Sequence, residues 1–398
     1  MSGADSDPLK HTPLYPLHVE LGARMAPFAG YEMPVHYGQH IITEHLFTRA
    51  QAGLFDLSHM GQVRLEGADP AVALETLVPG DIAGLEPYKT RYTLFTNEDG
   101  GILDDLMVTN AGDHLFLVVN AACTAQDIAH MTARLDGNLR VRELSDRALL
   151  ALQGPAAAEV LARFAPGCRD TVFLTAAELT IDGTPCFVTR CGYTGEDGFE
   201  ISTPADDAVR IARLLLDQPE VRPAGLGARD SLRLEAGFCL YGHDIDASTT
   251  PVEAGLAWTI PRRRRAEGGF PGAEVILRQL ANGVERKRVG IRPGGRAPAR
   301  AHTEIQDPDG NKVGEITSGG FGPTVGGPIA MGYVAARVAA KGSALRLMLR
   351  GTPRPAHVAA LPFVEPRYYG GPHYRGPRRG AAFRQAAALQ RLSGKGVP

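Results

Sequence analysis

The sequence predicts an α+β protein that ends in a separate all-β module. Its 398 residues are enough for two or three domains, each with a sizeable core. Residues 1–282 mix helical and strand patterns, which is typical of α+β domains. From about Gly283 the chain changes to short strands separated by Asp-Gly and Gly-Gly turns, with almost no helical period. We therefore expect a small Greek-key β-barrel over 283–369.

The first part of the chain predicts a helix, a β-hairpin and several further strands. The apolar spacing of 39–50 is that of an amphipathic helix, and Gly53 is its expected stop. Two apolar runs flank Asp99-Gly100-Gly101 within 92–110, which is typical of a hairpin. The other expected elements are one or two strands over 53–67, a strand over 114–120 and a helix over 122–135.

A second mixed segment begins near Val141. Its clearest signal is an Asp182-Gly183 turn between two apolar runs, which predicts another pair of strands. The other expected elements are strands over 147–154 and 199–203, helices over 155–164, 204–218 and 227–238, and loop-rich sequence from there to Pro261.

Charge and composition exclude several classes of function. The 42 Lys and Arg against 44 Asp and Glu give a net charge of −2, too balanced for nucleic acid or a membrane surface as the main partner. Residues 370–398 hold six Lys or Arg and no acid, so 36 basic and 44 acidic residues remain, a charge of −8. We expect an acidic globule with a basic, disordered tail. No apolar run approaches the ~18 residues of a membrane-spanning helix.

The N-terminal residues and the cysteines indicate a reduced compartment. The first fifteen residues contain Asp5 and Asp7 but no apolar core and no Arg, which excludes a secretory signal and argues against a transit peptide. The five cysteines are far apart without a Cys-x-x-Cys pair, as expected for reduced thiols. The prediction is a cytoplasmic protein, with the mitochondrial matrix as the alternative.

Two adjacent carboxylates, Asp104 and Asp105, interrupt an apolar strand. Successive strand side chains face opposite sides, so one carboxylate would face solvent and the other inward. An inward carboxylate could orient or deprotonate an amine nucleophile. The alternative is a solvated strand end or a local turn contact.

The segment CGYTGEDGFEIS places three glycines at intervals of three before a strand that contains Glu200. Glycines at this spacing would let the backbone approach a flat ligand, although a tight turn between strands is the simpler alternative. Glu200 would need either water or a partner, and a ligand edge with two adjacent N–H donors is one such partner.

Arg229 and Arg233 lie four residues apart on a predicted helix and share a face. Arg229, in the first turn, could meet an anionic or carbonyl oxygen, or it could form a surface ion pair with Asp230 or Glu235. A metal site at His36, His40, His45 and Glu44 is disfavoured because His45 falls on another helical face. Four cations at 262–265 predict a solvated loop, with docking of an acidic partner as the alternative.

Taken together, several motifs resemble one known family. They are FDLSHMGQV, LFTNEDGGILDDLMV, VTRCGYTGEDGFEIS, GLGARDSLRLEAGFCLYGHDID and TTPVEAGLAWTI, in this order. The sequence resembles the glycine cleavage T-protein family from about His11 to Tyr369. The resemblance implies three domains in a clover leaf: two interleaved α+β folate-binding domains over 1–282, with boundaries near 55 and 141, and the barrel.

The resemblance also implies the chemistry. The family transfers an aminomethyl carbon from the lipoyl group of H-protein to tetrahydrofolate, its co-substrate, and it uses no metal. Matched by motif, Asp105 is the catalytic carboxylate, and Glu200, Arg229 and Tyr368 bind folate. Further cavity positions are Met60, Tyr92, Asn120 and Tyr193.

Three alternatives use the same fold. A folate-dependent demethylase or oxidase would carry a flavin-binding region, and this chain has no dinucleotide fingerprint. A non-catalytic folate-binding assembly factor characteristically has Lys-Gly-Cys-Tyr-x-Gly-Gln-Glu where this chain has CGYTGEDG. A purely structural subunit would not need all four polar site residues. The transferase is the leading prediction.

Overall fold

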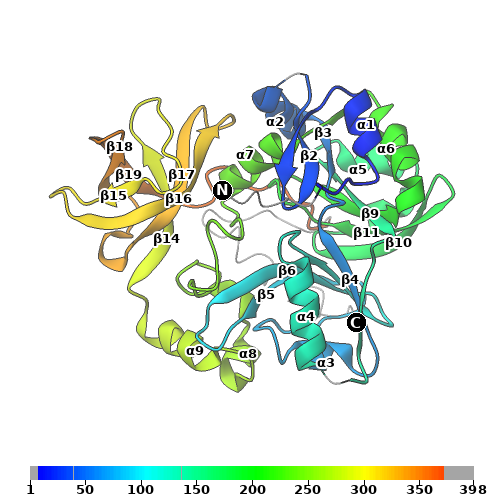
Figure 1. Ribbon diagram of the computed structural model, residues 1–398, viewed down its shortest axis with the longest axis horizontal. Coiled ribbons are helices and arrows are strands. Elements are labelled where there is room, and N and C mark those ends of the chain that lie inside the picture. The colour runs from blue at the N-terminus through cyan, green and yellow to red at the C-terminus, as the bar shows by residue number, and fades with distance from the viewer. Residues whose placement is uncertain (1–7, 39, 136, 372–398) are drawn as a thin grey trace, which may run out of the picture.

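The computed structural model describes residues 8–38, 40–135 and 137–371. The chain forms three lobes around a centre, each built on its own sheet (Figure 1). Two lobes combine a sheet with helices, and the third is a closed barrel, as the sequence predicts. Of the predicted tail 370–398, residues 372–398 lie outside the described part of the chain.

The first lobe is a six-stranded sheet in the order β10-β11-β12-β9-β3-β13. Its central strand β9 is apolar along nearly its whole length because both faces are covered. Helices α1, α5 and α6 pack on one face, and α7 packs on the other. The strands are β3 (Ala52–Asp56), β9 (Arg147–Gln153), β10 (Thr175–Ile181), β11 (Thr184–Arg190), β12 (Gly198–Pro204) and β13 (Val221–Pro223). The helices are α1 (Tyr15–Glu20), α5 (Ala157–Ala162), α6 (Ala208–Leu216) and α7 (Leu226–Ala236).

The second lobe is a five-stranded sheet in the order β5-β6-β7-β4-β8. The predicted hairpin is confirmed as β5 and β6, which pair antiparallel on either side of the Asp99-Gly100 turn. Helix α4 and the shorter α3 cover the apolar face of this sheet. The elements are β4 (Gly61–Glu66), α3 (Pro70–Leu74), β5 (Thr90–Thr96), β6 (Ile102–Asn110), β7 (Leu115–Val119), α4 (Thr124–Arg134) and β8 (Arg140–Glu143).

The third lobe is the predicted barrel, closed in the order β14-β17-β16-β15-β18-β19. Alternate side chains of each strand point inward and form one apolar core. The strands are β14 (Arg286–Pro293), β15 (Glu304–Gln306), β16 (Lys312–Gly322), β17 (Gly327–Ala335), β18 (Ala344–Leu349) and β19 (Thr352–Ala359).

The chain passes between the first two lobes more than once. Strand β3 pairs with β9 in the first sheet, whereas β4 pairs with β7 and β8 in the second. The predicted boundaries near 55 and 141 lie close to such crossings, and 283 lies just before the first barrel strand; the division into domains stays a prediction. The remaining elements are the hairpin β1 (Arg24–Phe28) and β2 (Tyr31–His36), α2 (His40–Ala50), α8 (Arg262–Glu267), α9 (Ala273–Asn282), and short 3₁₀ turns at Pro166–Asp170, Ala205–Asp207, Ala257–Thr259 and Ala336–Val338.

Two local predictions are wrong. Gly53 does not end a helix, because the chain enters β3 at once and Gly53 lies inside that strand. A Cβ there would clash with the Thr48 hydroxyl, so the close packing of α2 on β3 favours glycine at this position.

The four cations at 262–265 form helix α8 rather than a solvated loop. Arg263 pairs with Glu75, Asp81 and Glu267, and buried Arg264 donates to the Glu75 and Val78 carbonyls. These guanidinium groups join α8 to the second lobe.

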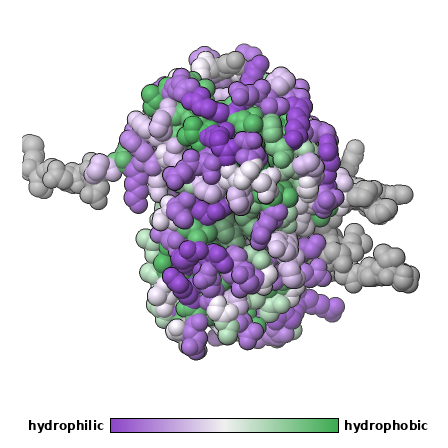
Figure 2. Space-filling view, turned by 90° about the vertical axis from the view of Figure 1, so that its right-hand side faces the viewer, coloured by the Kyte–Doolittle hydropathy of each residue, from purple (hydrophilic) through white to green (hydrophobic). Residues whose placement is uncertain are grey.

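Hydrophilic residues predominate on the face shown in Figure 2, and hydrophobic residues form separate patches between them. Among the described residues, no helix is both long and apolar enough to cross a membrane.

Candidate active site

A cavity of about 680 Å³ lies where the three lobes meet. Its walls come from the second sheet, from β12 and α7 of the first lobe, from the barrel, and from the segment that follows the barrel. All eight residues that the sequence singles out line it: Met60, Tyr92, Asp105, Asn120, Tyr193, Glu200, Arg229 and Tyr368. The fold therefore brings together positions that are spread over more than three hundred residues of sequence.

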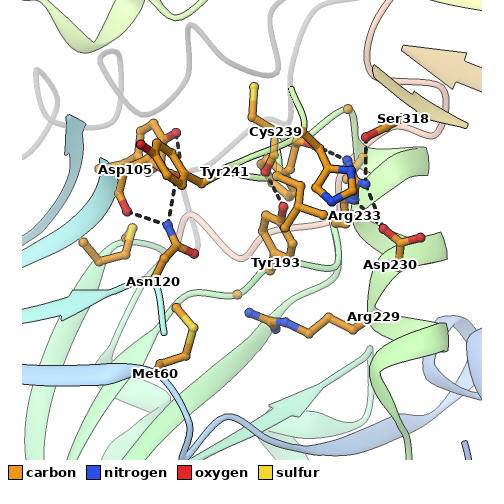
Figure 3. A pocket seen from close by; sticks show the side chains of 18 of the residues that line it. Met60, Asp105, Asn120, Tyr193, Arg229, Asp230, Arg233, Cys239, Tyr241 and Ser318 are labelled. Atoms are coloured by element: carbon orange, nitrogen blue, oxygen red, sulfur yellow. Dashed lines mark hydrogen bonds and ion pairs between the residues drawn. The ribbon is translucent and has the colours of Figure 1, made fainter. Parts of the chain in front are cut away.

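Asp105 enters the cavity from β6. Its Oδ2 accepts a hydrogen bond from the Tyr92 hydroxyl at 3.0 Å, and its Oδ1 accepts one from Asn120 Nδ2 at 2.8 Å. Asn120 follows β7, the neighbouring strand, and its amide points toward Asp105 (Figure 3). Burial and the negative charge of Asp104 raise the pKa of Asp105 to about 7.

The two aspartates face opposite sides of the sheet as predicted, but neither is fully exposed to solvent. Asp104 is fully buried, and it faces the helix-covered side of the sheet. It accepts hydrogen bonds from Asn120, from the backbone N–H at 3.1 Å and from Nδ2 at 2.8 Å. The strand alternation is as expected, but α4 covers the face that sequence alone left open.

Glu200 enters the cavity from β12, on another sheet. The Cys191 thiol donates a hydrogen bond to it, and the positive charge of Arg229 acts on it. Burial raises the pKa of Glu200, and these two neighbours oppose that shift. The site therefore pairs a half-buried anion with a cation from α7.

Arg229 does not form the surface ion pair that was the alternative. Its guanidinium lies 4.8 Å from the centre of the Tyr193 ring and points into the cavity (Figure 3). Among the described residues, its buried Nη1 has no hydrogen-bond acceptor. Arg233, one turn later, binds Asp230, Asp244 and Ser318 instead. Only Arg229 of this pair presents an unused donor to the cavity.

Two aromatic side chains are fixed by stacking. Tyr368 lies in the chain that returns from the barrel, and its ring stacks on Phe173 at 3.9 Å. The backbone N–H of Phe173 donates to the Tyr369 carbonyl at 2.8 Å, which ties this segment to the first lobe. Tyr193 stacks on Phe238 at 5.5 Å, and its hydroxyl donates to the Cys239 carbonyl. These contacts present flat apolar faces to the cavity.

The remaining predicted position is Met60, between β3 and β4, whose side chain packs on the apolar cluster of Phe55 and Leu232. The four residues of the disfavoured metal cluster do not converge, because His45 bonds to Ser231 and Glu235 while His36 and His40 lie beside each other. The described residues contain no group of three or more His, Cys, Asp or Glu placed to hold a metal ion.

Sequence reasoning missed several cavity residues. Cys191 beside the glycine loop, His59 next to Met60, and Trp258 stacked on Tyr92 at 5.6 Å all line the cavity. Trp258 could have been suspected from the sequence because it is the single tryptophan of the chain. Burial lowers the pKa of His59 to about 4, so this ring is neutral near pH 7.

Comparison with known proteins identifies the family. Residues 14–264 match the GCVT N-terminal domain, and residues 286–365 match the glycine cleavage T-protein C-terminal barrel domain. The chain belongs to the glycine cleavage T-protein family. It is an enzyme, since its relatives are aminomethyltransferases.

Similar proteins cover nearly the whole chain. The chain is 45% identical to the mitochondrial aminomethyltransferase of Dictyostelium discoideum, over 92% of this chain and 95% of that protein. It is 48% identical to the human mitochondrial aminomethyltransferase, over 91% of each chain. The crystal structure of the glycine cleavage system aminomethyltransferase T of Bartonella henselae superposes with a TM-score of 0.86 at 45% identity, over 91% of this chain and 99% of that one.

Proposed function

We propose that this T-protein family member transfers the aminomethyl carbon from the lipoyl sulfur of H-protein to tetrahydrofolate. The C–S and C–NH₂ bonds of the aminomethyl group break, and bonds from its carbon to N5 and N10 of folate form. The two protons that folate loses go to the lipoyl sulfur and to ammonia, which gives dihydrolipoyl H-protein and 5,10-methylenetetrahydrofolate. The family membership and the single cavity lined by all eight predicted positions support this function.

Binding of folate would use Glu200 and Arg229. A carboxylate has two acceptor oxygens, which match the paired N–H donors on the aminopyrimidinone edge of a pterin. The unused Nη1 of Arg229 supplies a donor for the neighbouring carbonyl oxygen. Tyr193, Tyr368 and Met60 offer apolar faces to a planar ring. The cavity volume falls within the ~300–1,000 Å³ of small-molecule sites.

The chemistry would use Asp105. When ammonia leaves, the transferred carbon becomes part of a cationic iminium, which a fixed anion nearby stabilises. The same carboxylate can take a proton from a folate nitrogen, since its pKa of about 7 populates both protonation states near neutrality. Tyr92 and Asn120 hold the carboxylate for these tasks. The position of Asp105 in this cavity, where Tyr92 and Asn120 hold its carboxylate, is the single observation that carries the catalytic proposal.

The partners would be H-protein and tetrahydrofolate, with neither nucleic acid nor a membrane surface among them. The compartment stays a prediction, with the cytoplasm first and the mitochondrial matrix second. The named relatives in Dictyostelium, potato and human are mitochondrial proteins, which favours the alternative.

Ammonia release from aminomethyl-loaded H-protein, with and without tetrahydrofolate, tests the function. We expect a large acceleration that requires folate. Folate binding without acceleration would instead indicate a non-catalytic binding protein on this fold.

A further inference from the structure

A third carboxylate, Asp127, lies behind the site. It is in the first turn of α4, the helix that covers the second sheet, and its side chain is 1% exposed. Among the described residues, neither of its carboxyl oxygens accepts a hydrogen bond from an N–H group or a hydroxyl. Burying a charged carboxylate without hydrogen-bond donors costs free energy, so the group that faces Asp127 decides whether Asp127 is protonated.

That group is the carboxyl of Asp104, which lies within hydrogen-bonding reach of Asp127. Two carboxyl groups form a hydrogen bond only when one of them holds a proton. Asp104 accepts two hydrogen bonds from Asn120 and one from the Cys123 thiol, all of which favour its anion. Asp127 has no comparable donors, so of the two carboxyl groups it is the one better placed to hold the proton.

The pair connects to Asp105 through one amide group. Asn120 Nδ2 donates to Asp104 Oδ1 and to Asp105 Oδ1, and each N···O distance is 2.8 Å. The amide therefore bridges a fully buried anion and the cavity carboxylate. Its orientation depends on Asp104 remaining an acceptor.

We propose that Asp127 is a positioning residue for the transfer reaction: as a protonated acid it donates to Asp104, keeps that carboxylate an oriented anion, and thereby fixes the Asn120 amide that holds Asp105. The proposal rests on the role of Asp105 given above. It assigns a task to a residue on the far side of the sheet from the cavity.

The charge around the three carboxyl groups follows from this assignment. Burial raises the pKa of Asp127 to about 10, and the bond to Asp104 adds to that shift. The other titratable groups that face the three carboxyl groups are Tyr92 from β5, Cys123 before α4, and Tyr193, Cys239 and Tyr241 from loops. Burial raises the pKa of each of them, so all are neutral near pH 7 and Asp104 is the charge that acts on Asp105.

Three variants and a control separate the alternatives through the pH profile of kcat/KM. Asp127→Asn keeps an N–H donor toward Asp104 without adding charge, so we expect the acidic limb to stay within about 0.3 pH units and kcat to fall about threefold. Asp127→Leu removes the donor, and kcat should fall tenfold or more with KM for folate within threefold. Asp104→Asn removes the anion and should move the acidic limb at least about half a unit to lower pH. Asp99→Asn, exposed in the β5–β6 turn, is the matched control and should change neither quantity.

Infrared difference spectroscopy of the purified full chain tests the proton without any assay of activity. We expect the carbonyl band of a protonated carboxylic acid to persist at pH 8 in the wild type and in Asp105→Asn, and to be absent in Asp127→Asn. Absence of the band in the wild type would show that Asp127 is not protonated. An acidic limb that moves as far in Asp127→Asn as in Asp104→Asn would show the same. An unchanged kcat in a folded Asp127→Leu would overturn the positioning role. Full activity of Asp105→Asn would refute the proposed role of Asp105. The infrared result would still decide whether Asp127 is protonated beside Asp104.

Discussion

Asp105 and Glu200 are both half-buried carboxylates that reach one cavity from strands, yet the two lobes surround them differently. Asp105 on β6 has a hydroxyl and an amide as donors and an anion, Asp104, as its neighbour. Glu200 on β12 has a thiol donor and a cation, Arg229, as its neighbour. A neighbouring anion raises the pKa of a carboxyl group, so that it can bind and release a proton near neutral pH. A neighbouring cation lowers the pKa and favours the ionised form, which accepts hydrogen bonds. The same functional group is therefore prepared for chemistry on one sheet and for binding on the other.

The largest effect should come from Asp105→Asn. The amide cannot take a proton and supplies no anion, so we expect kcat at saturating folate to fall about 100-fold or more. The dissociation constant for folate, measured by calorimetric titration, should stay within a few-fold. A kcat near the wild-type value would remove Asp105 from the chemistry.

Glu200→Gln should have the converse effect. One acceptor becomes a donor that faces a donor of the ligand, which costs ~1–3 kcal/mol, or about fivefold to 150-fold in affinity. A direct folate titration checks this, and Glu159→Gln, on an exposed face of α5, is the control. Unchanged affinity would exclude Glu200 from the folate site.

The raised pKa of Asp105 also predicts how stability depends on pH. A carboxyl whose folded-state pKa of about 7 exceeds its unfolded value of 3.8 favours the folded state below pH 4, and this contribution is lost as pH rises through 7. Asp105→Asn lacks this loss, so it should gain on the order of 4 kcal/mol relative to wild type between pH 4 and pH 8. Urea unfolding at both pH values measures the difference, and equal gains at both would contradict the pKa shift.

The smallest effect should come from Tyr92→Phe. It removes one neutral hydrogen bond to Asp105 and keeps the ring that stacks on Trp258. We expect kcat to fall about threefold to tenfold and the acidic limb of the pH profile to rise, because the hydrogen bond favours the anion. A limb that moves to lower pH would show that Tyr92 does not stabilise the Asp105 anion.

Local pattern predicted much of the fold. The Asp182-Gly183 turn is predictable because an Asp-Gly pair readily adopts the positive φ angles that a tight hairpin turn requires. In the structure these angles are 48° and 81°. The barrel and the β5–β6 hairpin were found from strand length and turn residues. The α8 helix was missed because four consecutive arginines carry no apolar period, and its stabilising contacts are to Glu75 and Val78, far away in sequence.

The site was predictable only in part. Spacing alone indicated Asp105, Glu200 and Arg229 as open alternatives, and the family resemblance placed them in one cavity. The burial of Asp104 and its contact with Asp127 depend on how α4 packs on the sheet, which no local pattern encodes. The same is true of the Cys191 thiol, whose role is visible only once β12 places Glu200 beside it.

The central claim is the division of labour between the two carboxylates, and single-turnover transfer from loaded H-protein over a range of folate concentrations tests it most directly. We predict that Asp105→Asn stays slow at every folate concentration, whereas Glu200→Gln approaches the wild-type rate at saturating folate. A rate for Asp105→Asn that recovers with folate, or a rate for Glu200→Gln that does not, would contradict the account.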